Sequence, residues 1–308
     1  MKSYVKEKVV KLQLADGWQG LAVEKWADLA FEPEKLTENP QAVFKSAPDS
    51  ITGLKELEDN GKILKVSFVF KKNVSRFKGR TIVDFVRGAK AVRNFNLALE
   101  LNGKQIDSAR PAAALWRRNG LRKIENIYLA EYIPGSMSLY DIAFGKNLEI
   151  ISNFRLRKEV INQVAQIIAK LRKGGYWHRD SKAGNFIVYK NGDEGYRVKL
   201  IDLDGIKLNF VFMGKNNIRT LSKLAETLTR FKAVNFTDLY RGFLYYCEEM
   251  KMYHGERRRL FRQVERMTVA KRLMTIIADS YKLNGEQESL INDEKLKFKK
   301  KHSYQLSV

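Results

Sequence analysis

A short polar stretch, WHRDSKAGNF (residues 177–186), holds residues whose types and spacing are suited to chemistry. Asp180 supplies a carboxylate, and Asn185 supplies an amide oxygen five positions later, before the sequence becomes apolar again. A carboxylate can accept the proton of an attacking hydroxyl, and an amide oxygen is a good ligand for a hard cation such as Mg²⁺. A loop whose only role was to reverse the direction of the chain would need neither the carboxylate nor the amide. The pattern therefore indicates a site where a hydroxyl, a divalent metal and phosphate groups meet.

A second carboxylate follows at the end of a strand-like segment. The apolar pieces at 185–190 and 196–203 flank the turn-rich NGDEG at 191–195, which predicts a hairpin. Because the two strands of a hairpin are antiparallel, such a hairpin would start at Asn185 and bring Asp202 back beside the loop that holds Asp180 and Asn185. The order of loop carboxylate, amide, β-turn and second carboxylate is the order that phosphoryl transfer requires.

These residues predict a division of roles. Asn185 and Asp202 would hold Mg²⁺ on the phosphates of a nucleotide, so both are candidate metal and nucleotide ligands. Asp180 would orient the attacking hydroxyl and accept its proton. Lys182, two positions later, would neutralise charge that develops on the transferred group. His178 is predicted to support the backbone of the loop and not to exchange protons.

The spacing of His178, Arg179, Asp180 and Asn185 resembles H-R-D-x-x-x-x-N, the catalytic-loop signature of protein kinases. His-Arg-Asp alone arises easily by chance, whereas the longer match joined to a hairpin and a second aspartate does not. An active kinase-like enzyme is therefore the main interpretation. An inactive relative that keeps the fold is the alternative.

A hinge for the nucleotide base is predicted upstream. The segment LAEYIPG (129–135) resembles the hinge of a kinase, at the end of a strand that stops at Pro134-Gly135. There, backbone groups from Glu131 to Ile133 would hydrogen-bond adenine, and apolar neighbours would sandwich the ring.

The residues that would contact the phosphates are predicted on the first strands. No G-x-G-x-x-G loop is present, so KSAPDSITG (45–53) is the candidate cover for the phosphates. Lys71, at the end of the apolar run SFVF, is the predicted phosphate contact, and Lys65 is the alternative. The glutamate expected early in the following helix (87–103) is missing, and Glu100 near its end is not a convincing ion-pair partner for the lysine.

The elements that must position these residues change character near residue 134. Strand-like segments such as KILKVSFVFKK (62–72) precede this point, with one helix among them. Helical periodicity dominates after it, at 153–175 and from 217 to 285. We predict an α+β, protein-kinase-like fold with a β-rich nucleotide-binding lobe (1–134) and a helical catalytic lobe with a basic tail (135–308).

The composition narrows the class of protein. Hydrophobic residues make up 44% of the 308 positions and aromatic residues 11%, which is typical of a folded chain. The net charge of +22 favours polyanionic partners. The single cysteine, Cys247, excludes an internal disulfide and favours a reducing compartment. The N-terminus lacks the apolar core of a signal peptide, and no stretch reaches the ~20 apolar residues of a membrane span.

From about residue 40 to 245 the chain resembles the bacterial lipopolysaccharide core kinases, which phosphorylate heptose or Kdo sugars. DSARPAA after the predicted helix, and DLDG with Asp204 where protein kinases have the glycine of DFG, are more particular to this group than the His-Arg-Asp motif. By analogy with sugar kinases, Asp204 would assist Asp202 in binding metal. The resemblance rests on five segments: FVFKK, RGAKAVRNFNLALELNGKQIDSARPAA, YLAEYIPG, HRDSKAGNFIV and LIDLDGIKL.

The resemblance implies a kinase-like fold, use of ATP and Mg²⁺, and transfer to a sugar of the lipopolysaccharide core glycolipid. It also implies a cytoplasmic protein, peripheral on the inner face of the inner membrane, whose basic excess attracts the anionic surface and the acceptor. No nucleic-acid partner is expected, and no motif indicates the oligomeric state. The candidate membrane contacts are RLRK (155–158), ERRRL (256–260) and KLKFKKK (295–301).

Two other functions are weighed against this one. A protein kinase would use the same residues, but no A-P-E segment follows Asp202 and only a short stretch separates DLDG from the next helix. A non-catalytic basic module that binds nucleic acid or membrane would explain the net charge. A function of this kind would not explain the placement of Asn185 and Asp202.

Overall fold

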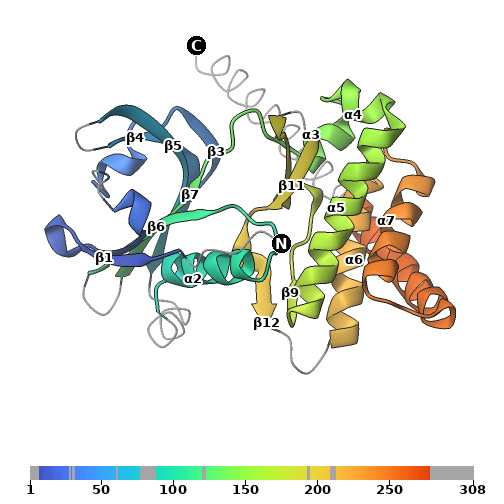
Figure 1. Cartoon of the computed structure of the whole chain (residues 1–308). Helices are drawn as coiled ribbons and strands as arrows, with labels where there is room; N and C mark the ends of the chain where they lie inside the picture. The colour runs from blue at the N-terminus through green and yellow to red at the C-terminus, as the bar shows by residue number, and fades with distance from the viewer. Residues whose placement is uncertain are drawn as a thin grey trace, which may run out of the picture.

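The computed structural model shows an α+β chain, as predicted: strands prevail up to residue 131, and helices prevail from residue 139 onward. Figure 1 shows strands β1 to β7 gathered on one side of the molecule with α2 beside them, and the other helices on the opposite side with the short strands β9, β11 and β12 next to them. The structure describes residues 7–27, 29, 32–59, 62–76, 88–119, 123–192, 195–208 and 213–277.

Seven strands form an antiparallel sheet in the order β1-β2-β6-β7-β5-β4-β3. The long strand β5 is rich in β-branched and aromatic residues, which suit a half-buried pleated surface. Phe68 and Phe70 of β5 are fully buried in one core, so Lys71 points to the opposite face. The strands are β1 Val9–Gln13, β2 Gln19–Val23, β3 Ala42–Ala47, β4 Ser50–Asp59, β5 Lys62–Arg76, β6 Pro111–Asn119 and β7 Lys123–Glu131.

Helix α2 (Lys90–Gly103) covers the face of the sheet to which Lys71 points. Its buried residues recur at helical spacing, and Ala91 and Phe95 pack against Ala114 of β6. Small side chains on β6 allow the helix to approach the strand closely. Figure 1 shows α2 between the sheet and the short strand β12. This position places the start of the helix beside the loops of the second half of the chain.

The second half of the chain is built on helices around one apolar core. The long helix α5 begins at Asn153, whose side chain accepts hydrogen bonds from the backbone of Arg155 and Leu156. The named helices are α3 Leu139–Phe144, α4 Leu148–Ser152, α5 Phe154–Lys173, α6 Met213–Leu228 and α7 Phe236–Glu249, and residues 254–277 are also helical.

Two small sheets carry the polar loops of this half. One has the order β11-β10-β8, and the other pairs β12 with β9. Cys247 is a fully buried free thiol in the helical core. The strands are β8 Met137–Ser138, β9 Tyr176–His178, β10 Phe186–Lys190, β11 Tyr196–Leu200 and β12 Ile206–Leu208.

The sequence prediction differs from the structure in several elements. Strands β1, β2 and β6 were not predicted, and the proposed phosphate cover at 45–53 is a hairpin of β3 and β4 that turns at Pro48 and Asp49. The predicted basic tail (294–308) lies outside the described residues. The region of predicted helical periodicity from 217 to 285 is described only to residue 277.

Candidate active site

Two short strands join the loop that holds Asp180 to the loop that holds Asp202. In the β9–β12 pair, His178 lies opposite Ile206. Just beyond it, the backbone N–H of Arg179 donates to the carbonyl of Gly205, 2.8 Å away. The DLDG segment therefore lies directly against the His-Arg-Asp segment, although more than twenty residues separate them in sequence.

The Asp180 loop is held by its own hydrogen bonds. The backbone N–H of Asp180 donates to Nδ1 of His178 at 3.2 Å, and the carbonyl of Asp180 accepts from Nδ2 of Asn185 at 2.7 Å. The carbonyl of Asn185 in turn accepts from the N–H of Ile201 at 2.8 Å. These bonds orient the Asn185 amide and tie it to the residue just before Asp202.

Asp202 has a left-handed backbone conformation, with φ 57° and ψ 66°. This region is uncommon for a residue other than glycine, and it costs free energy that the surrounding structure must offset. The conformation turns the chain sharply after β11 and leaves the Asp202 side chain about one-third exposed. A strained, accessible carboxylate at the end of a strand is suited to binding a ligand.

Lys71 links the sheet to this loop. Its Nζ lies 2.8 Å from Oδ1 of Asp202 and 2.5 Å from Oδ2 of Asp204. Burial would lower the pKa of Lys71, but the carboxylates of Asp204 and Asp202 outweigh burial and raise it. Lys71 is therefore a firmly held ammonium group at the junction of the two halves. The side chain of Lys65, the alternative, lies outside the described residues.

Asp204 is surrounded by cationic and amide groups from α2, which the sequence analysis missed. Nζ of Lys90 lies 2.7 Å from Oδ2 of Asp204, and Nδ2 of Asn94 donates to Oδ1. Burial would raise the pKa of Asp204, but Lys71 and Lys90 outweigh it and lower the pKa to about 2. The available signal was the four-residue spacing of Lys90 and Asn94, which places both on one face of the helix.

The early helix glutamate that a kinase lysine would pair with is absent, and the structure shows what replaces it. Lys71 binds the two aspartates of DLDG directly, while α2 contributes Lys90 and Asn94 to the same cluster. Glu100 lies elsewhere and accepts from Lys104, 2.7 Å away. Glu100 is therefore not the ion-pair partner of Lys71.

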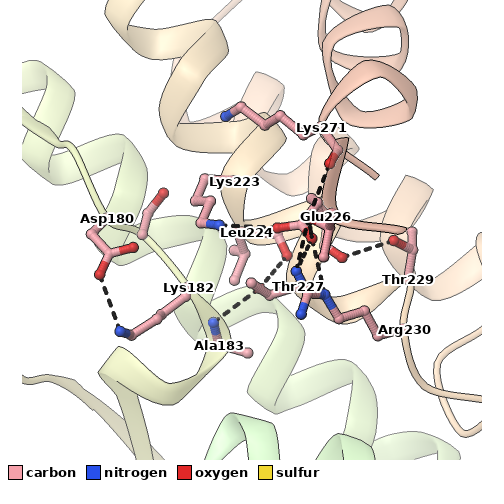
Figure 2. Close-up of polar contacts among 12 residues, drawn as sticks. Asp180, Lys182, Ala183, Lys223, Leu224, Glu226, Thr227, Thr229, Arg230 and Lys271 are labelled. Carbon is pink, nitrogen blue, oxygen red and sulfur yellow. Dashed lines mark hydrogen bonds and ion pairs between the residues drawn. The ribbon is translucent and has the colours of Figure 1, made fainter. Parts of the chain in front are cut away.

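Lys182 lies beside the Asp180 carboxylate, with Nζ 3.1 Å from Oδ2, as Figure 2 shows. Both side chains are more than one-third exposed. An exposed pair of this kind contributes little to stability. The two groups are accessible to a substrate that approaches the loop.

His178 is buried below the loop and packs against Gly205. A Cβ on Gly205 would lie 2.6 Å from Cε1 of His178, so only glycine fits there. Burial lowers the pKa of His178 to about 4, and the nearby carboxylates of Asp202 and Asp180 oppose this only in part. The imidazole is therefore neutral at pH 7 and accepts the Asp180 N–H through Nδ1.

This burial predicts a pH dependence of stability. The unfolded imidazole, with a pKa near 6.5, binds a proton that the folded one, with a pKa of about 4, does not. The free energy of unfolding should therefore fall by about 3 kcal/mol as the pH is lowered from above 6.5 to about 4. Urea denaturation at several pH values measures this, with His178→Gln as the comparison. Parallel pH profiles for the two proteins would contradict the assignment.

At the predicted hinge, two of the three backbone N–H groups from Glu131 to Ile133 already donate hydrogen bonds within the protein. The N–H of Glu131 donates to the carbonyl of Arg110 at 3.0 Å, and that of Tyr132 donates to Ser67 at 3.1 Å. The Glu131 side chain pairs with Lys25. Within the described part of the chain, the N–H of Ile133 makes no hydrogen bond to the protein backbone. Ile133 is thus the donor that remains for a base.

The donor set fits Mg²⁺ with nucleotide phosphates. Asn185 and Asp202 offer the amide and carboxylate oxygens that this ion prefers, and phosphates supply further oxygens. No group of three or more histidine, cysteine, aspartate or glutamate side chains suited to a metal occurs among the described residues. A site shared with phosphate oxygens does not need one.

The sheet supplies a lysine, and the loops of the helical half supply Asp180, Asn185 and Asp202. This combination places the chain in the class of protein-kinase-like phosphotransferases. A family model described as the lipopolysaccharide kinase (Kdo/WaaP) family matches residues 73–243. This range is more than half of the 308 residues, and the chain belongs to this family. The resemblance seen in the sequence, and the kinase activity that it implies, are confirmed.

A solved structure described as "WaaP in complex with acyl carrier protein" is similar to this chain, with a TM-score of 0.50 and 15% sequence identity. The similarity covers 73% of this chain and 88% of that one. At this identity it supports the fold alone, and it confirms the predicted fold class. Comparison with curated proteins by sequence found no match. Among the described residues, no helix has the length and apolar character needed to cross a bilayer.

Proposed function

We propose that this lipopolysaccharide kinase transfers the γ-phosphoryl group of ATP to a hydroxyl of a heptose or Kdo sugar in the lipopolysaccharide core. The observation that carries the proposal is the contact of Lys71 with Asp202 and Asp204, beside the loop in which Asn185 holds the carbonyl of Asp180. This arrangement supports the proposal because groups suited to binding phosphate, binding a metal ion and accepting a proton lie close together.

The nucleotide would lie between the halves of the chain, which we propose as a nucleotide-binding lobe (1–134) and a catalytic lobe (135–308). Ile133 N–H and the carbonyl of Glu131 would bind adenine. Lys71 would contact the phosphates, and Thr52 lies opposite it on β4, so the β3–β4 hairpin is close enough to cover them.

Asn185 and Asp202 would hold Mg²⁺, which when bound neutralises negative charge on the phosphates. The charge of the nucleotide would draw Lys71 away from the two aspartates that it now bridges. Asp204 keeps Lys90 and Asn94 as partners after such a move. We therefore propose Asp202 as the principal metal ligand and Asp204 as the group that anchors the loop to α2.

In the transfer step, the hydroxyl oxygen of the sugar forms a new bond to the γ-phosphorus. The bond from that phosphorus to the bridging oxygen breaks, and ADP leaves with the electron pair. Asp180 accepts the hydroxyl proton. Lys182, which pairs with Asp180 at 3.1 Å, is placed to neutralise charge on the transferred group.

The test is transfer of γ-labelled phosphate from ATP to lipopolysaccharide core precursors that carry heptose, Kdo or both. Labelled glycolipid is expected, and mass spectrometry of the product identifies the sugar and hydroxyl. Label on protein serine or threonine, with none on glycolipid, would favour the protein-kinase alternative. The absence of both, with no thermal shift by Mg²⁺ and ATP, would favour a non-catalytic module.

We further propose that the chain docks on the cytoplasmic face of an anionic membrane through the helix at 254–277. Arg258 and Arg259 are exposed on this helix, and Leu273 and Ile277 are each about half exposed farther along it. A basic helix with exposed apolar side chains is typical of membrane-surface segments. In the RLRK segment, by contrast, Arg157 pairs with Asp238 and so has a structural role.

The double variant Arg258→Glu/Arg259→Glu should bind anionic vesicles at least about tenfold more weakly, because each basic residue near the surface contributes about 1 kcal/mol. Co-sedimentation with vesicles of phosphatidylglycerol and phosphatidylethanolamine measures this. Lys190→Glu, which changes an exposed lysine on β10, serves as the control. Equal binding by the double variant and the control would refute the proposed surface.

The solved WaaP structure is of a complex with acyl carrier protein. We propose that this chain also binds such a carrier, because a cavity of about 390 Å³ with an almost wholly apolar lining lies among α5, α6 and α7. A cavity of this kind suits part of an acyl chain. Native mass spectrometry should show tighter binding of an acylated carrier than of an unacylated one. Equal binding would argue against it.

A further inference from the structure

Helix α6 lies directly against the Asp180 loop. The hydroxyl of Ser181 donates to the carbonyl of Thr220 at 2.6 Å, and the backbone N–H of Ala183 donates to Oγ1 of Thr227 at 3.1 Å. Figure 2 shows the second of these bonds and the same stretch of α6 beside Asp180 and Lys182. Thr220 and Thr227, two turns apart on α6, therefore both lie against the catalytic loop.

Three cationic side chains gather on this part of the molecule. Arg219 and Lys223 lie one turn apart on α6, and Lys271 reaches them from the helix at 254–277. Nζ of Lys271 donates to the carbonyl of Arg219 at 3.1 Å. Burial lowers the pKa of Lys271, and the positive charges of Lys223 and Arg219 lower it further, while the carboxylate of Glu226 opposes them in part. The cations are thus close enough to repel one another.

The carboxylate of Glu226 offsets these positive charges only in part. Its side chain is fully buried, and it pairs with Arg230 and with Lys223, whose Nζ lies 3.1 Å away. It also accepts from Thr275 at 3.3 Å, which fastens α6 to the helix at 254–277. The single negative charge of Glu226 is shared by Arg230 and Lys223, so this group of three side chains keeps an excess of one positive charge. Within the described part of the chain, Arg219 and Lys271 form no ion pair with a carboxylate.

We infer that Arg219, Lys223 and Lys271 form a binding site for an anionic group of the acceptor, a phosphate or a carboxylate, next to the sugar hydroxyl that reacts. This inference rests on the proposed function. Three repelling cations beside a catalytic loop are stabilised when an oxyanion binds among them, and hydrogen bonds to such ions are strong. The nucleotide would have its own cation, Lys71, on the side of the sheet.

Isothermal titration calorimetry with a delipidated core oligosaccharide tests this site, without ATP and with every protein carrying Asp180→Asn, so that no transfer occurs. Adding Arg219→Gln and Lys271→Gln should weaken binding by about tenfold or more, because hydrogen bonds between charged groups are lost. Arg266→Gln, an exposed arginine on the same helix as Lys271, should leave binding unchanged. A melting curve for each variant shows whether it folds.

The chemistry of the ligand is identified by changing the oligosaccharide. Removal of its phosphates, or esterification of its carboxylates, should reproduce the loss in the Asp180→Asn protein and cause no further loss in the triple variant. Equal binding of the charged and uncharged oligosaccharides, or no effect of the two substitutions, would overturn the inference. Because no transfer is measured, the result is independent of whether the chain phosphorylates this acceptor.

Discussion

An Asp180→Asn variant is expected to transfer phosphate about 10²- to 10⁴-fold more slowly than the native chain, because it lacks the group that accepts the hydroxyl proton. The loss should appear in kcat, with the KM for ATP little changed, since the carboxylate of Asp180 pairs only with the exposed Lys182 among the described residues. Steady-state assays with labelled ATP and a core glycolipid measure both constants.

The substitution should leave the loop intact, which makes the result interpretable. The hydrogen bonds that shape the loop use the backbone N–H and carbonyl of Asp180, not its side chain. Lys182→Met is the companion variant, and a smaller loss in kcat is expected because a neutralising charge is removed while the base remains. Native-like turnover by Asp180→Asn, with an unchanged melting temperature, would eliminate the mechanism.

Asp202→Asn and Asp204→Asn should have different effects, although the residues are two apart. Asp202→Asn is expected to lower kcat/KM for ATP by about 10²- to 10³-fold, as losing one preorganised electrostatic contact often does, and to raise the Mg²⁺ concentration needed for half-maximal activity. Asp202 is the more exposed carboxylate, and among the described residues only Lys71 forms an ion pair with it. Its loss should therefore change the melting temperature little.

Asp204→Asn should instead destabilise the chain, because Lys71 and Lys90 would lose a shared carboxylate. The pKa of Asp204 is about 2 in the folded chain against 3.8 ordinarily, so its contribution is present above pH 3.8 and is lost as the pH falls to about 2. That contribution is about 2 kcal/mol at neutral pH. Urea denaturation at pH 7 measures it, and a larger loss for Asp202→Asn than for Asp204→Asn would reverse the roles.

The sequence predicted some elements of the fold well and others not at all. Strand β5 and helix α5 have strong local patterns, of β-branched residues in one and of three- and four-residue apolar spacing in the other. Strand β6 was missed because its alanine-rich sequence, PAAALWRRN, has little β-propensity. These alanines are explained by the packing of α2 against the strand, which is a tertiary contact that the local sequence does not reveal.

Within the candidate site, too, some features follow from the local sequence and others only from tertiary contacts. The identities of Asp180, Lys182, Asn185 and Asp202 were read from spacing along the chain, because a loop followed by a hairpin is a local structure. Glu131 and Ile133 were read from a strand end, but which of their N–H groups remain free depends on pairing with Arg110 and Ser67.

The sequence by itself determined the class of chemistry, because the catalytic loop, the hairpin and the DLDG turn are contiguous and their geometry is set by hydrogen bonds among near neighbours. Only the tertiary structure decided which cations meet which carboxylates. Lys71, Lys90 and Asn94 come to Asp204 from a strand and a helix more than one hundred residues earlier. Electrostatic interactions of this kind depend on distance in space, and spacing along a chain does not specify that distance.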